Sequence, residues 1–146
     1  MKIAIGNDHR GVKLKHVIQA HFKDRVFQDV GSNHPEEKVD YPDFAKKVCE
    51  SILSGESKLG ILICGSGIGM SMAANKFHGI RAAMVWNPEV AKMSRQHNDA
   101  NVLCLSSDFT DEKKTLEIVE TWLNTEFEGG RHKNRVDKLK EIEELT

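Results

Sequence analysis

The sequence predicts an α/β protein in three layers, with a mainly parallel five-stranded sheet covered by helices on both faces. Two observations carry this prediction. Short apolar runs alternate with amphipathic segments along the chain, as they do when helices connect successive strands. One run, Leu59–Cys64, is apolar throughout, which is typical of a parallel strand covered on both faces.

Five segments are expected to form the strands of this sheet, because their residues are mostly apolar or β-branched. They are Lys2–Gly6, Val26–Val30, Leu59–Cys64, Ile80–Trp86 and Asn101–Ser106. Between them, helices are expected from about Val12, from about Pro42, behind a glycine-rich turn at 65–69, from near Pro88 and after Asp111. Proline suits the first turn of a helix, which supports the starts at residues 42 and 88.

The C-terminal segment Lys133–Thr146 is also expected to be helical. It is highly charged and carries one narrow apolar stripe, formed by Val136, Leu139, Ile142 and Leu145. So short a helix needs a surface to lean on, and we expect it to pack on a partner subunit.

Length and composition limit the class of protein. The 146 residues suit a single domain over 1–146. The chain has 21 basic and 22 acidic residues and no basic tract, which argues against nucleic acid as a partner. No apolar run approaches the roughly 20 residues that span a membrane, and the N-terminus turns polar too early for a signal peptide. The three cysteines form no C-x-x-C pair, so we expect a soluble protein of the reduced cytoplasm.

The stretch ICGSGIGMSMAANK, residues 63–76, is the most informative for function. It places Cys64 at the carboxyl end of a strand, followed by glycines at 65, 67 and 69 and then a helix. Glycines allow close backbone approach, and the N–H groups at a helix start can hold an anion. The same N–H groups would stabilise a thiolate and an oxyanion forming beside it. Abstraction of a proton next to a carbonyl requires such a base and oxyanion site. The alternative is that Cys64 is a small buried apolar residue.

Three familiar interpretations of a glycine-rich turn do not fit. A dinucleotide fingerprint and a cysteine-phosphatase loop would need glycine and arginine, respectively, where Met70 stands. The phosphate-binding pattern G-x-x-x-x-G-K-[ST] is absent.

Other polar residues could join Cys64. Asp8 and His9 follow the first strand, and Tyr41 follows the second, so all three belong to the same edge of the sheet. Asp8 could alternatively only cap a helix. His97 could act as an acid or base, or be a solvated histidine at a helix end. It precedes the last strand, at the opposite edge from Cys64, so a joint role would need two subunits.

Arg131 and Arg135 lie four residues apart, so on a helix they share a face and could bind one phosphate, or could be plain surface arginines. The remaining cysteines are expected to be inert, and Met70 and Met72 to pack in the core. The other histidines show no metal-ligand spacing, so no metal site is expected. They are His16, His21, His34 and His78.

Several segments together resemble the type B ribose-5-phosphate isomerases, which belong to a sugar-phosphate isomerase family that includes galactose-6-phosphate isomerase subunits. The segments are IAIGNDHRGVKLK, VDYPDFA, GILICGSGIGMSMAANK, GIRAA, SRQHNDANVL and FEGGRHKNRV. The resemblance runs along nearly the whole chain. It implies a Rossmann-like fold, interconversion of ribose 5-phosphate and ribulose 5-phosphate without metal or cofactor, and homodimers or homotetramers with shared active sites.

The resemblance also implies roles for individual residues. Cys64 would be the base that moves a proton between C1 and C2, and the turn Gly65–Gly69, which includes Ser66, Gly67 and Ile68, would hold the enediolate oxygens. His97 would open the sugar ring with help from Asp8. The phosphate would be bound by His9, Arg131 and Arg135, and the sugar site lined by Tyr41 and Asn98. His97, Asn98, Arg131 and Arg135 would come from the partner subunit.

The chain departs from many family members at Ser66, where threonine is common. The hydroxyl is kept and a methyl is lost, so we expect retained chemistry in a looser site. A second branch of the family uses a glutamate on this loop, but no carboxylate lies between Gly60 and Lys76. Alternatives are isomerisation of a six-carbon sugar phosphate (allose or galactose 6-phosphate), a non-catalytic sugar-phosphate binding module, and a thiol redox sensor.

Overall fold

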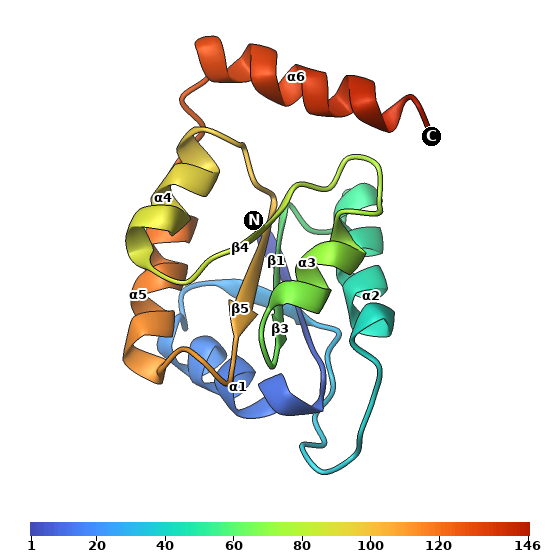
Figure 1. Ribbon diagram of the computed structural model, residues 1–146. Coiled ribbons are helices and arrows are strands. Elements are labelled where there is room, and N and C mark those ends of the chain that lie inside the picture. The colour runs from blue at the N-terminus through green and yellow to red at the C-terminus, as the bar shows by residue number, and fades with distance from the viewer.

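In the computed structural model, which describes residues 1–146, five parallel strands form one sheet between two layers of helices (Figure 1). The strands are β1 (Lys2–Asn7), β2 (Val26–Asp29), β3 (Leu59–Cys64), β4 (Ala82–Met84) and β5 (Val102–Ser106). Their order across the sheet is β2-β1-β3-β5-β4, with β3 at the centre. The predicted α/β sandwich is therefore confirmed.

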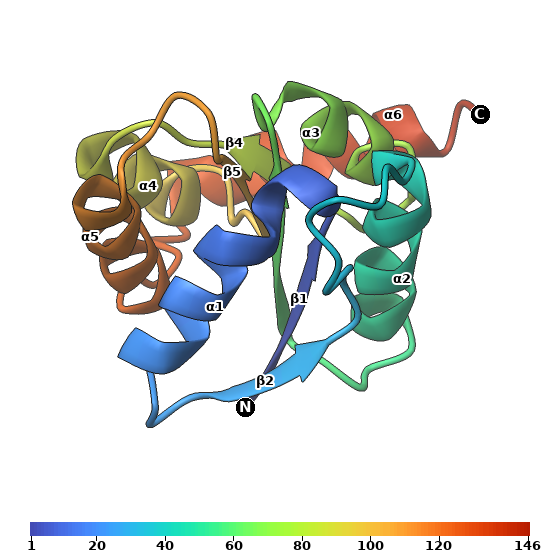
Figure 2. The same ribbon diagram turned by 90° about the horizontal axis from the view of Figure 1, so that it is seen from below.

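Seven helical segments connect and cover the strands. They are the 3-10 turn η1 (His9–Gly11), α1 (Val12–His21), α2 (Tyr41–Leu53), α3 (Ile68–Ala74), α4 (Pro88–Gln96), α5 (Glu112–Leu123) and α6 (Arg131–Glu143). Helices α1, α4 and α5 cover one face of the sheet, and α2 and α3 cover the other (Figure 2).

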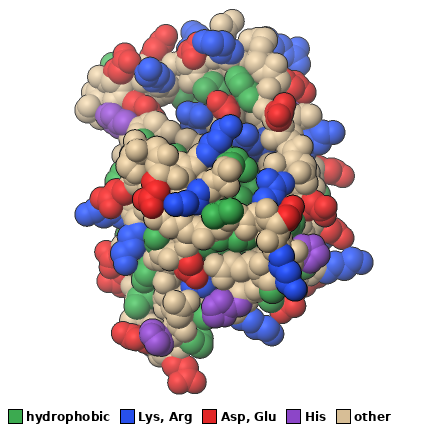
Figure 3. Space-filling view, turned by 180° about the vertical axis from the view of Figure 1, so that it is seen from behind, with side chains coloured by type: hydrophobic (Ala, Val, Ile, Leu, Met, Phe, Trp, Pro, Cys, Tyr) green, Lys and Arg blue, Asp and Glu red, His purple; other side chains and the backbone are tan.

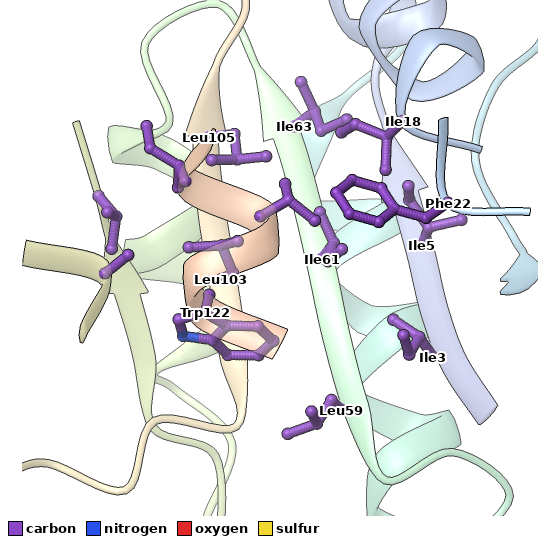
Figure 4. Packing of buried hydrophobic residues seen from close by; sticks show 14 of the residues in the cluster. Ile3, Ile5, Ile18, Phe22, Leu59, Ile61, Ile63, Leu103, Leu105 and Trp122 are labelled. Carbon is purple, nitrogen blue, oxygen red and sulfur yellow. The ribbon is translucent and has the colours of Figure 1, made fainter. Parts of the chain in front are cut away.

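The alternation of side chains along β3 builds a core on each side of the sheet. Ile61 and Ile63 face the layer of α1, α4 and α5, where Trp122 of α5 is fully buried (Figure 4). Leu62 and Cys64 face α2 and α3. The thiol thus belongs to the α2/α3 face, at the end of the most enclosed strand.

Three expectations need correction. The fourth strand spans only Ala82–Met84, not Ile80–Trp86. Its start is delayed because the N–H groups of Asn101 and Val102 both donate to the Arg81 carbonyl and interrupt the regular ladder there. Helix α6 covers Arg131–Glu143, earlier than the expected Lys133–Thr146. Met72 is not a core residue, since its side chain is 62% exposed on the outer face of α3.

Helix α6 stands apart from the two layers, at the top of Figure 1. Gly129 and Gly130 precede it with positive φ angles of 70° and 55°, which side chains rarely adopt. At its far end, the Gly79 N–H donates to Glu143 at 2.9 Å. Its apolar residues Leu139 and Ile142 remain 45% and 60% exposed. None of the helices combines the length and the apolarity needed to cross a membrane.

Candidate active site

The loops that follow β1, β3 and β5 meet at the carboxyl edge of the sheet, where the strand order reverses between β1 and β3. Ligands of open α/β sheets bind in the crevice at such a point. The Asp8 N–H donates to the Ile63 carbonyl at 3.2 Å, and the Ser107 N–H donates to the Cys64 carbonyl at 2.9 Å. These bonds hold the first residue after β1 and the first after β5 against the end of β3.

Cys64 lies at the base of the glycine-rich turn. Cys64 is only 5% exposed, and its Sγ accepts a hydrogen bond from the Gly67 N–H at 3.2 Å. Gly67 has a φ of 79°, a left-handed conformation that glycine adopts without steric cost. The Ser66 Oγ accepts from the Ile68 N–H at 3.2 Å, so the hydroxyl is held at the start of α3. The sulfur therefore meets one backbone N–H group of the turn and is not enclosed by apolar atoms alone.

Asp8 and His9 stand beside this turn. Asp8 is buried, and burial raises the pKa of its carboxyl above 3.8, despite a 3.0 Å hydrogen bond from the Arg10 N–H that lowers it. The capping role considered from the sequence is thus present, and it leaves Asp8 better able to hold a proton than an exposed aspartate. His9 Nδ1 accepts from the Val39 N–H at 3.2 Å. A neutral His9 ring therefore carries its proton on Nε2, which remains a donor for an anion.

Tyr41, the first residue of α2, closes the turn from the side. A Cβ atom built on Gly69 would lie 2.7 Å from the Tyr41 ring, so only glycine lets the two segments pack this closely. Gly69 itself lies in the first turn of α3 rather than in the connecting loop. This position shortens the predicted turn to residues 65–67.

An ion pair that the sequence did not reveal spans the same edge. Arg10 Nη2 and Asp108 Oδ2 lie 2.8 Å apart, and a Cβ atom on Gly65 would come within 3.0 Å of that carboxylate oxygen. The pair therefore passes over Gly65, next to the thiol. The available signal was position: Arg10 belongs to the DHRG stretch after β1, and Asp108 follows β5.

His97, Asn98, Arg131 and Arg135 lie at the opposite, amino edge of the sheet. His97 is the residue at which α4 ends, Asn98 is exposed beside it, and the two arginines occupy the first two turns of α6. A strand rises about 3.3 Å per residue, so the five residues of β5 separate the two edges by about 15 Å. One chain does not bring these residues to Cys64, as the sequence indicated.

Sequence reasoning also missed a group next to His97. The rings of His97 and His132 stack with centroids 4.3 Å apart, and His132 Nε2 lies 3.4 Å from Glu128 Oε2. Glu128 and His132 are four residues apart at the start of α6, and this spacing was the signal that could have indicated the contact between them.

The fold and the carboxyl-edge site define an α/β protein with a buried thiol at the edge of the sheet where open α/β proteins bind their ligands. Its family follows from comparison with known proteins: residues 3–139 match the ribose/galactose isomerase family, and the chain belongs to that family.

Individual relatives extend over almost the entire chain. The ribose-5-phosphate isomerase B of Escherichia coli K12 is 45% identical over 144 residues, covering 98% of this chain and 97% of the relative. The structure of Clostridium thermocellum ribose-5-phosphate isomerase B is 50% identical, with a TM-score of 0.96 and 99% of both chains covered. The Mycoplasma genitalium enzyme, crystallised with bound ribulose 5-phosphate, is 44% identical with a TM-score of 0.94, covering 99% of this chain and 97% of that one.

Proposed function

We propose that the chain, as one domain over residues 1–146, interconverts D-ribose 5-phosphate and D-ribulose 5-phosphate through an enediolate, without metal or cofactor. The observation that carries the proposal is Cys64, a thiol buried at the end of β3 whose sulfur accepts a hydrogen bond from the Gly67 N–H. The names of the relatives, and the ribulose 5-phosphate bound by one of them, supply the substrate.

The proton transfer is assigned to Cys64. As a thiolate, it removes the C2 proton of the open-chain aldose while the C1 carbonyl oxygen gains negative charge. Backbone N–H groups of the 65–69 segment stabilise that oxygen, and Ser66 adds a hydroxyl. The proton returns to C1, a second proton moves from the C2 hydroxyl to the C1 oxygen, and the ketose forms.

Ring opening and substrate binding require the other edge of the sheet. His97 transfers the proton that opens the furanose, and Asp8, whose pKa burial raises, assists at the ring oxygen. His9 donates through Nε2 to the phosphate, which Arg131 and Arg135 neutralise. Tyr41 and Asn98 line the sugar; the two residues stand at opposite edges of the sheet. A single site that contains all these groups needs two copies of the chain.

The surface of the chain supports this assembly. Around the carboxyl edge, Ile68, Trp86 and Phe109 expose 48%, 58% and 83% of their surface. Such apolar exposure is typical of a surface that another protein covers. The apolar stripe of α6 is exposed as well, so each chain offers both an apolar rim and an apolar helix.

A groove of about 490 Å³ separates α6 from the β4 edge (Figure 3). It is lined by Asn75, Ile80, Arg81, Ala82, Ala83, Asn98, Ala100, Leu139, Ile142 and Glu143. We infer that a second copy covers these surfaces in a homodimer, or in a homotetramer built from two such dimers, and that the protein acts in the cytoplasm.

The test is turnover of ribose 5-phosphate by the purified chain with EDTA present, alongside Cys64→Ala and Cys64→Ser. Both variants should lose at least about 10²-fold in kcat, as removal of a general base does, while still binding substrate. Cys49→Ala is the matched control and should retain activity, because Cys49 lies in the core between α2 and α3.

A Cys64 variant that turns over within about threefold of wild type would reject the base assignment. If the folded wild-type chain leaves ribose 5-phosphate unchanged but converts allose or galactose 6-phosphate, the proposed substrate is wrong and a six-carbon sugar phosphate takes its place. Binding without exchange of the C2 proton would reject catalysis altogether.

A further inference from the structure

The amino edge of the sheet carries a cluster of three side chains that could hold a metal ion: His97, Glu128 and His132. One ligand atom from each lies within 4.8 Å of the others. They come from three consecutive places around the base of α6, namely the end of α4, the loop before α6 and the first turn of α6. Neither Glu128 nor His132 has a part in the isomerisation proposed above.

The backbone holds the cluster in place. The Glu128 N–H donates to the Gln96 carbonyl at 3.1 Å, which fixes the loop directly beside His97. Arg95 Nε donates to the Thr125 carbonyl at 3.1 Å and ties the start of the same loop to α4. The three ligands therefore do not depend on side-chain contacts alone for their proximity.

The distance between two of the three ligand atoms suits a tetrahedral zinc ion. Histidine nitrogen and carboxylate oxygen bind Zn²⁺ at about 2.0–2.2 Å, so two such ligands of a tetrahedral ion lie about 3.3–3.6 Å apart. His132 Nε2 and Glu128 Oε2 are 3.4 Å apart. This distance is long for an N–H···O hydrogen bond but matches the separation of two ligands on one tetrahedral ion. The remaining separations are at most 4.8 Å, and the His97 and His132 rings, now stacked 12° from parallel, must turn toward each other so that both nitrogen lone pairs point at one ion.

The electrostatic surroundings fit a reversible site. Glu128 contributes one negative charge. Arg131 and Arg135 oppose a divalent cation, so the ion should exchange with solution rather than reside permanently. His132 is buried whereas His97 is only half-buried, which leaves a side open for water as the fourth ligand.

We propose that His97, Glu128 and His132 bind Zn²⁺, and that the bound ion inhibits the enzyme by occupying His97. Binding follows from the geometry of this cluster. Inhibition additionally rests on the proposed function, because it requires His97 to serve in ring opening.

The binding test uses the full chain with Cys64→Ala, which removes the active-site thiol as a competing zinc ligand. Titration calorimetry with Zn²⁺ should show one ion per chain. Adding Glu128→Gln, which keeps the shape of this half-exposed side chain, should weaken binding by more than about tenfold, since even outer-shell partners of a metal contribute that much. His132→Gln should do the same. Adding His16→Gln, at an exposed histidine outside the cluster, should have no effect.

Absence of saturable binding, or equal affinity in the Glu128→Gln and parent chains, would overturn the proposed site. Circular dichroism of each variant separates loss of a ligand from loss of the fold. Co²⁺ substituted for Zn²⁺ gives a second readout, because its visible absorption distinguishes nitrogen and oxygen ligands from thiolates.

The inhibition test uses chains with Cys64 intact. Zn²⁺ should lower wild-type turnover and EDTA should restore it, whereas Glu128→Gln should keep its basal activity and need more than about tenfold more Zn²⁺ for the same inhibition. Equal zinc sensitivity in both chains would overturn inhibition through this cluster. A wild-type chain inactive even with EDTA would instead reject the proposed function, while the calorimetry would still decide on the metal site.

Discussion

The separation of Cys64 and His97 within one chain makes a quantitative prediction about mixed subunits. Each chain carries the thiol at one sheet edge and the imidazole at the other, about 15 Å away along β5. If a site takes Cys64 from one chain and His97 from its partner, Cys64→Ala and His97→Asn homodimers are both inactive. A mixed dimer, however, has one site with both substitutions and one site with neither.

The expected recovery follows from counting sites. Random reassociation of equal amounts yields mixed dimers in about half of the population, and each has one intact site of two. The mixture should therefore regain about a quarter of wild-type activity, starting from variants that each lose at least about 10²-fold. The assay is ribose 5-phosphate turnover after co-expression of the two variants with different affinity tags. Purification over both tags then keeps only the mixed dimers and should raise the recovered activity to about half of wild type.

A suitable control pairs Cys64→Ala with the double variant Cys64→Ala/His97→Asn. Mixed dimers form equally well in this pair but lack Cys64 in both chains, so no activity should return. If the doubly purified Cys64→Ala and His97→Asn mixture also stays inactive, the shared-site reasoning is refuted.

Three further variants test individual contacts. Burial raises the pKa of Asp8, so the folded chain binds the proton of this carboxyl more tightly than the unfolded chain does. Protonation of Asp8 therefore stabilises the fold fully below about pH 3.8, and this stabilisation is lost as the pH rises through the pKa of the folded state. Asp8→Asn should therefore lose activity and have a higher Tm than wild type at pH 7 but not at pH 4. A variant whose Tm equals that of wild type at both pH values would contradict this. Lys15 is fully buried and donates to Asp29 at 3.1 Å and to the Ser32 carbonyl at 2.6 Å. Lys15→Met should therefore lower the free energy of unfolding, measured in urea, by about 3 kcal/mol. A decrease of less than about 1 kcal/mol would show that these contacts contribute little. Arg135→Ala should raise KM roughly tenfold or more with a smaller change in kcat, since hydrogen bonds between charged groups contribute about 1.5–3 kcal/mol, and an unchanged KM would remove Arg135 from the phosphate site.

The fold was predictable because hydrophobic patterning determines which segments are buried. The continuous apolar run of β3 indicated a central parallel strand, and β3 is paired on both sides, with β1 and with β5. The start of β4 was not predictable, since it depends on Asn101 and Val102 sharing the Arg81 carbonyl. Strand order also depends on long-range packing rather than on any local signal.

The two halves of the site differed in the same way. Cys64, which ends a strand, and Asp8, which directly follows one, could be placed at one edge from chain order alone. The Arg10–Asp108 ion pair and the His97–His132 stack could not, because each joins segments that are distant in sequence. Such contacts arise only when the three-dimensional arrangement of the loops is known.

The burial of Cys49 and Cys104 determines which cysteine a thiol-labelling reagent can reach. Burial raises the pKa of the Cys49 thiol to about 12 and that of Cys104 well above its ordinary value, so both remain protonated and shielded. Alkylating reagents and peroxides attack thiolates, which leaves Cys64, whose sulfur accepts a hydrogen bond from the Gly67 N–H, as the thiol that we expect to react. Because the proposed function places Cys64 in the active site, the mass added by a brief iodoacetamide pulse should report how many sites in a preparation are intact and unoccupied.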